Sequence, residues 1–96
     1  MKPMTKDYHT SLLADLRDPE EAAAYLRAAL EERDMPTFLL ALRNVAEAHG
    51  MSALAAKAQL NRESLYRMLS GQGNPQLASV RALLQALDLD LTVTAK

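Results

Sequence analysis

The sequence has 96 residues, of which 49% are hydrophobic and 4% aromatic, and it contains no cysteine. This length suits one small domain, and the lack of cysteine excludes disulfides and thiolate metal sites. No stretch reaches the ~20 apolar residues of a membrane span, and the first residues lack the apolar run of a signal peptide. We therefore expect a cytoplasmic protein without membrane contact, whose leucine- and alanine-rich core favours helices over a β-sandwich.

Charge is distributed unevenly along the chain, although the net charge is only −1. Residues 1–34 carry five Lys/Arg and eight Asp/Glu, which gives −3, whereas residues 35–96 carry six and four, which gives +2. The whole surplus of +2 lies within Met51–Gly71, where Lys57, Arg62 and Arg67 face a single acid, Glu63. If this stretch binds nucleic acid, a basic surplus this small predicts a dimer, modest affinity and strong salt dependence. The alternative is that the surplus has no function.

Residues 1–34 are predicted to form an N-terminal helical extension that packs on the rest of the chain. A short amphipathic stretch carries Tyr8, Leu12, Leu13 and Leu16. Asp18 and Pro19 then begin a helix that is expected to run to about Arg33, because aspartate caps helices well and proline suits the first helical position. Glu20 and Glu21 lie in the first turn, where the helix dipole favours acids.

Residues 35–96 are predicted to form a second, compact unit. Met35-Pro36 begins a helix with a wide apolar stripe, and Gly50 ends it. Two short helices then follow within Met51–Gly71, separated by a tight turn. We expect Ser52 to cap the first of them, Asn61 to cap the second, and Gly71 to end the second in a left-handed conformation.

The last part of the chain changes its period. Asn74 is expected to cap a helix that Pro75 opens, with Leu77, Val80, Leu84 and Leu87 on its inner face. After it, Leu89, Leu91 and Val93 alternate with polar residues, and a period of two predicts a strand.

The pair of short helices resembles the helix-turn-helix of Cro and phage-repressor-type regulators. The match consists of Ala55, Leu60, Leu65 and Gly71, and it departs at Gln59, where the family favours glycine and a left-handed residue costs ~1–3 kcal/mol. The resemblance implies an all-α fold: a five- to six-helix, lambda-repressor-like domain with an N-terminal helical extension and a short C-terminal β-strand. It also implies that the second helix reads the DNA major groove. The candidate DNA-binding residues are Ser52, Lys57, Asn61, Arg62, Glu63, Tyr66 and Arg67; the alternative is a solvated helix face.

Catalytic and metal-binding patterns are missing from the sequence. His9 and His49 are isolated, and no cluster at metal-ligand spacing surrounds them. Ser64 lies in a predicted helix, without the strand and turn that expose a nucleophile. We therefore expect no enzyme, no catalytic residue, no metal and no cofactor.

The chain as a whole resembles the probable addiction module antidote family, the HigA-like antitoxins of type II toxin–antitoxin systems. The matching residues span roughly residues 8–93 and are Asp18-Pro19-Glu20, Ala22, Tyr25-Leu26, Phe38-Leu39, Ala41-Leu42-Arg43, Val45-Ala46-Glu47-Ala48, Gly50-Met51, Leu65-Tyr66-Arg67 and Gly73-Asn74-Pro75. The resemblance implies a protein that silences a RelE/HigB-like ribonuclease toxin and represses their shared promoter. The alternatives are a stand-alone repressor and a toxin-binding module that does not read DNA.

Two interfaces follow from this reading. A toxin that grips RNA is basic, so the acidic extension is the expected toxin site, with Tyr8, Leu12, Leu16, Glu20, Glu21, Tyr25, Glu31 and Glu32 as candidates. The alternative is that the extension only braces the body. A lone strand needs a partner edge, so Leu89, Leu91 and Val93 are expected to join a homodimer; the alternatives are pairing with the toxin and an unpaired tail.

Overall fold

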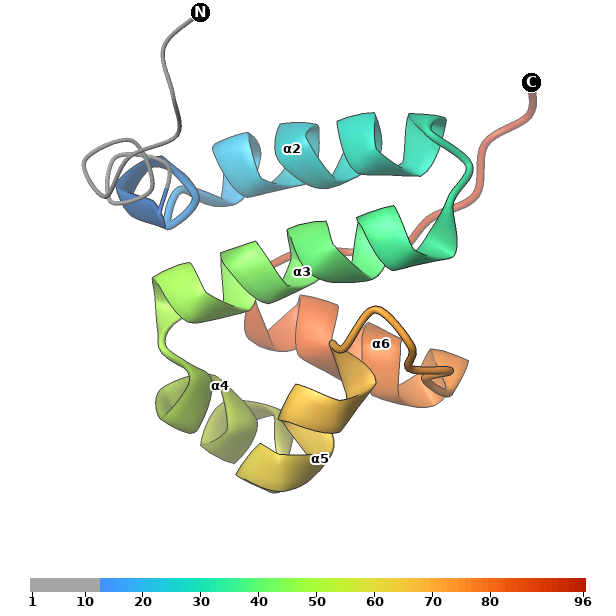
Figure 1. Ribbon diagram of the computed structural model, residues 1–96. Coiled ribbons are helices and arrows are strands. Elements are labelled where there is room, and N and C mark those ends of the chain that lie inside the picture. Colours follow the sequence, from blue (N-terminus) through green and yellow to red (C-terminus); the bar gives the residue numbers. More distant parts are fainter. Residues whose placement is uncertain (1–12) are drawn as a thin grey trace, which may run out of the picture.

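The computed structural model describes residues 13–96, and within them it consists of helices and connecting segments without a strand. A helical turn at residues 13–15 precedes the helices α2 (Pro19–Glu31), α3 (Met35–His49), α4 (Met51–Ala58), α5 (Arg62–Met68) and α6 (Leu77–Ala86) (Figure 1). The all-α class is confirmed. The predicted C-terminal strand is wrong for the single chain, because a strand needs a neighbouring edge and residues 90–96 form no backbone ladder with any described residue.

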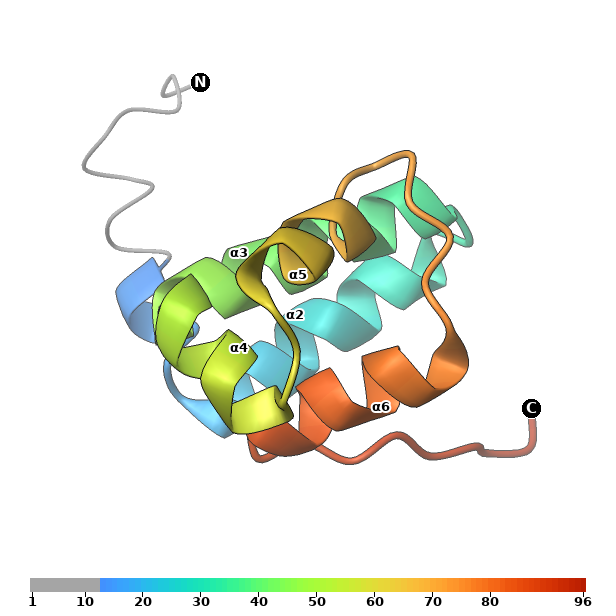
Figure 2. The same ribbon diagram turned by 90° about the horizontal axis from the view of Figure 1, so that it is seen from below.

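Helix α3 is the centre of the molecule. Helix α2 runs antiparallel along one side of it, and α4, α5 and α6 lie on the other side (Figures 1 and 2). The side chains of Leu42, Val45 and Ala46 on α3 are 0–1% exposed, and Ala22 and Leu26 bring α2 into the same core. Two polar contacts also join the layers: the Asn44 side-chain amide donates to the Tyr25 hydroxyl over 2.8 Å, and Arg17 Nε donates to the Ala48 carbonyl over 3.1 Å. Arg17 and α2 thus pack on α3 through both apolar and polar contacts.

Three of the helices begin at a side-chain cap. Asp18 accepts from the Glu20 N–H at 3.1 Å, Asp34 from the Thr37 N–H at 3.1 Å, and Asn61 from the Ser64 N–H at 2.6 Å. The predicted caps Asp18 and Asn61 are confirmed, whereas Asp34 had no role in the sequence prediction. Each cap satisfies an N–H group that a helix cannot satisfy internally.

Other predicted helix ends are wrong. Gly50, with φ 104°, is the only residue between α3 and α4, so Ser52 lies inside the first turn of α4 and makes no cap bond. Helix α5 ends at Met68 with Leu69, at φ −93°, as its C-cap, because its last turn tightens before Gly71 is reached. Helix α6 begins at Leu77 rather than at Pro75, and its N-cap, Gln76, forms no side-chain bond.

The chain after α6 starts with an ordered turn. Asp88 has φ 63°, and the Leu89 N–H returns to the Leu84 carbonyl over 2.8 Å, which closes the end of α6. Leu89 packs against the core. Beyond it, residues 90–92 and Thr94 line a groove of about 350 Å³ together with Ala23, Leu26, Arg27 and Leu30 of α2, Phe38, Leu84 and Leu89. The segment therefore lies beside α2, while Val93 is 96% exposed.

The turn between α4 and α5 is built on a non-glycine residue in the left-handed conformation. Gln59 has φ 59° and ψ 40°. Its N–H donates to the Ala56 carbonyl at 3.2 Å, and the Leu60 N–H donates to the Ala55 carbonyl at 2.9 Å. This pair of bonds is a Schellman motif, in which glycine is the least strained residue. The departure from the glycine pattern leaves the turn intact.

Replacing Gln59 should reveal the strain of this turn. We expect Gln59→Gly to raise the free energy of unfolding by about 0.5–1 kcal/mol, because glycine adopts positive φ without a Cβ clash. The matched control is Ala56→Gly in the exposed interior of α4, which should lower it by about 1 kcal/mol. Urea denaturation followed by circular dichroism measures both. Equal losses in the two variants would show that residue 59 is not left-handed in solution.

Candidate functional site

The sequence-predicted DNA-binding residues form an exposed surface on α4, the turn and α5. Helix α5 buries Leu65 and Met68 and turns its other side to solvent. All seven candidates are exposed: Ser52, Lys57, Asn61, Arg62, Glu63, Tyr66 and Arg67. Helical spacing places Arg62 beside Tyr66 and Glu63 beside Arg67, in two adjacent rows. The surface therefore offers both hydrogen-bond donors and one carboxylate acceptor.

Asn61 has a defined structural task in this surface. Its side-chain oxygen accepts from the Ser64 N–H and so fixes where α5 begins. The side-chain amide nitrogen takes no part in that bond. The position of Arg62 and Glu63, in the first turn of α5, thus depends on the Asn61 cap.

Tyr66 lies between two arginines. The guanidinium carbon of Arg62 is 5.6 Å from the centre of its ring, and that of Arg43 is 5.9 Å away. Both distances fall within the range of cation–π attraction. Arg43 comes from α3 and was not a predicted site residue. In the sequence it stands four residues before Glu47, and the two side chains form a 3.0 Å bond.

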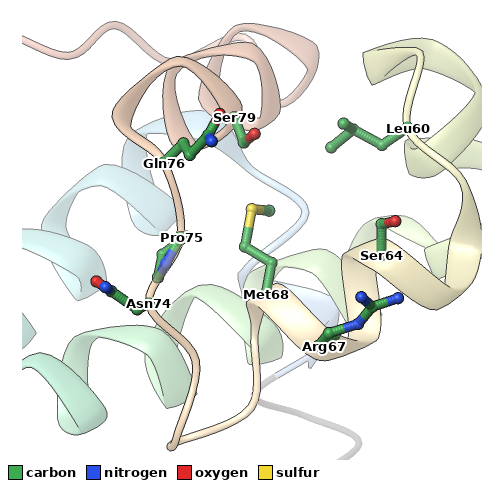
Figure 3. A pocket seen from close by; sticks show the side chains of 8 residues that line it. All are labelled: Leu60, Ser64, Arg67, Met68, Asn74, Pro75, Gln76 and Ser79. Atoms are coloured by element: carbon green, nitrogen blue, oxygen red, sulfur yellow. The ribbon is translucent and has the colours of Figure 1, made fainter.

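A groove lies along the other edge of α5 (Figure 3). Its volume is about 210 Å³, and the residues that line it are Leu60, Ser64, Arg67, Met68, Asn74, Pro75, Gln76 and Ser79. Met68 points into the space between α5 and the start of α6, and both polar and apolar side chains lie around this space (Figure 3). Asn74, Gln76 and Ser79 were missed in the sequence because nothing local shows that this loop folds back to α5.

The acidic candidates lie on a different part of the molecule. Glu20, Glu21, Glu31 and Glu32 are exposed at the two ends of α2, and α2 and α5 lie on opposite sides of α3 (Figure 1). Leu16 is 4% exposed, so it serves the core and offers almost no surface to a partner. Tyr25 is half-buried, with its hydroxyl bonded to Asn44. Tyr8 and Leu12 lie outside the described residues.

The three residues proposed to join a dimer differ in exposure. Leu89 is half-buried against the core, Leu91 is 45% exposed, and Val93 is 96% exposed. Leu91 and Val93 therefore present apolar side chains to solvent.

Comparison with known proteins identifies the family of this chain. The model of the probable addiction module antidote protein family matches residues 6–95. The chain belongs to this family. An uncharacterized protein of Haemophilus influenzae is 38% identical over 93 residues, which is 97% of this chain and 94% of the relative. No solved structure matches the chain.

Membership of the antidote family indicates the role of an antitoxin, whose partner is a toxin. Within residues 13–96, no group of three or more His, Cys, Asp or Glu side chains is placed to hold a metal ion. None of the described helices combines the length and apolar character needed to cross a membrane. The antidote family match covers both exposed surfaces described above, the α4–α5 surface and the acidic ends of α2.

Proposed function

We propose that this antitoxin binds a RelE/HigB-like ribonuclease toxin in the cytoplasm and represses the promoter that the two share by reading operator DNA with α5. The observation that carries the DNA-reading part is the α4–turn–α5 unit: a three-residue turn, an apolar inner face on both helices, and an exposed polar face on α5. A major groove is about 12 Å wide and admits one helix presented in this way. The five described helices are compatible with a lambda-repressor-like domain.

The first turn of α5 is the end that meets base edges in such domains. Arg62 can donate twice to a guanine, and Glu63 can accept from a cytosine amino group. Tyr66 and Arg67 lie further along the helix and are proposed to hold phosphates, together with Ser52, Lys57 and Asn61. Phosphate contacts position the protein, and base contacts specify the sequence.

Arg62→Ala should weaken binding to the cognate operator by ~1–3 kcal/mol and relax the preference at one base pair. Lys57→Ala is the control, because the loss of a phosphate contact should weaken all sequences evenly. Gel shifts with the duplex upstream of the protein's own reading frame, and with single-base variants of it, measure both effects. If Arg62→Ala binds like the wild type, α5 does not read DNA through this face.

The toxin-binding part of the proposal rests on charge at α2. Glu31 and Glu32 stand at the C-terminal end of this helix, where the dipole disfavours acids, and the last turn contains no basic residue. These acids therefore do not serve the stability of α2, and a basic partner would explain them. Glu20 and Glu21 add acidity at the other end, Tyr8, Leu12 and Tyr25 remain the proposed anchors, and Leu16 is too buried for this role.

Neutralising the two acids should separate toxin binding from folding. We expect the Glu31→Gln/Glu32→Gln pair to be at least as stable as the wild type, because an unfavourable interaction with the helix dipole is removed. The same variant should associate more slowly with the toxin encoded by the adjacent gene, and Glu31→Lys/Glu32→Lys more slowly still, with the difference shrinking at high salt.

Stopped-flow association and rescue of growth during toxin expression are the measurements. If Glu31→Lys/Glu32→Lys associates with the toxin at the wild-type rate at low salt, these acids do not bind the toxin. The role of α2 would then be only to support α3. Removal of the whole extension is a poorer test, because α2 covers core residues of α3.

We also propose a homodimer joined through Leu89, Leu91 and Val93, since a two-fold dimer suits two half-sites ~34–36 Å apart. Ending the chain after Leu89 keeps the turn that closes α6 and removes the two exposed apolar side chains. Sedimentation should then show a monomer, and operator binding should weaken. A dimer of unchanged strength would place the interface elsewhere.

A further inference from the structure

Arg43 is held in a fixed position beside α5. Its Nε donates to Glu47 Oε1 over 3.0 Å, and its guanidinium carbon lies 5.9 Å from the centre of the Tyr66 ring. The side chain is nevertheless 42% exposed. A charged group that is both oriented by two contacts and open to solvent is available to a ligand.

The bond to Glu47 engages only the Nε of the guanidinium. The terminal amino groups of Arg43 form no hydrogen bond with any described residue. Arginine presents these groups in a planar fork that matches the oxygens of a phosphate. Their hydrogen-bonding capacity is thus left for a partner outside the described chain.

The position of Arg43 relative to Arg62 suggests that partner. Both guanidinium groups lie within 6 Å of the same Tyr66 ring, Arg62 at 5.6 Å. Arg62 and Tyr66 share the edge of α5 that faces α3, whereas Arg67 borders the groove on the opposite edge. With Arg43, the cationic surface therefore extends from α5 to the neighbouring helix α3.

We propose that Arg43 is a further DNA contact, which binds a backbone phosphate flanking the base pairs that α5 reads. This inference rests on the proposed function and extends its footprint to α3. Tyr66 acts as the spacer that sets the distance between the two guanidinium groups, and Glu47 orients the fork. Because Arg43 comes from the supporting helix and not from α5, it contributes register and affinity rather than sequence preference.

The test is the salt dependence of binding to the duplex upstream of the protein's own reading frame, measured by fluorescence anisotropy. Arg43→Gln keeps most of the side-chain stem and removes the charge. We expect it to weaken the cognate and a scrambled duplex by the same factor, and to reduce the slope of log K against log salt by about 0.9, the value for one phosphate. Arg43→Lys should restore the slope.

Arg27→Gln is the matched control, because it removes the same charge from exposed α2, on the far side of α3 (Figure 1). Its slope should equal that of the wild type. A purely structural role of Arg43 would lower the affinity without changing the slope. A wild-type slope in Arg43→Gln, with or without a lower affinity, therefore overturns the inference. If the wild-type protein itself does not bind the duplex, the proposed DNA-reading function fails and this inference fails with it.

Discussion

Burial of α3 from two sides is the constraint on which the rest of the structure depends. Leu42, Val45 and Ala46 are almost completely buried, with α2 packed on one side of the helix and α4–α6 on the other. Replacing a buried leucine with alanine typically lowers the free energy of unfolding by about 2–5 kcal/mol. Loss of either layer would therefore remove much of the stability of a small domain. The hydrogen bonds that Asn44 donates to Tyr25 and that Arg17 donates to Ala48 add directional contacts to this packing. This arrangement places α2 and α5 on opposite sides of α3.

Helix α5 is stabilised by its contacts with the rest of the domain, and its exposed face contributes little to the stability of the helix. Seven residues are too few for a stable isolated helix. The helix is held instead by the Asn61 cap, by burial of Leu65 and Met68, and by the Schellman turn at Gln59. Since these contacts use only the inner face and the start of the helix, the outer side chains stay exposed to solvent. The groove of Figure 3 and the Arg43–Tyr66 contact border this outer face on its two edges.

Local sequence patterns were sufficient to predict the helices, but not all of their caps or the residues that pack beside them. The 3.6-residue periods and the Asp18-Pro19 and Met35-Pro36 starts located α2 and α3 correctly, and Asn61 was recognised as a cap. Ser52 and Gly71 were misassigned because cap preference does not say which nearby residue adopts the required backbone. The alternation around Leu89–Val93 reports a change in side-chain direction and cannot supply a neighbouring strand. Arg43 and Asn74 were not predicted as site residues because their closeness to α5 arises from tertiary packing.

The junction at Gly50 has a consequence for how the length of this chain can vary. One residue ends α3 and begins α4, and its φ of 104° suits glycine even though no atom would crowd a Cβ there. An inserted helical residue would turn everything beyond it by about 100° and shift the exposed face of α5 away from its present direction. The connection between α5 and α6 contains eight residues with no helix, Leu69–Gln76, and can absorb such a change. Insertions and deletions in the family should therefore gather after α5, while the spacing between α3 and α5 stays constant.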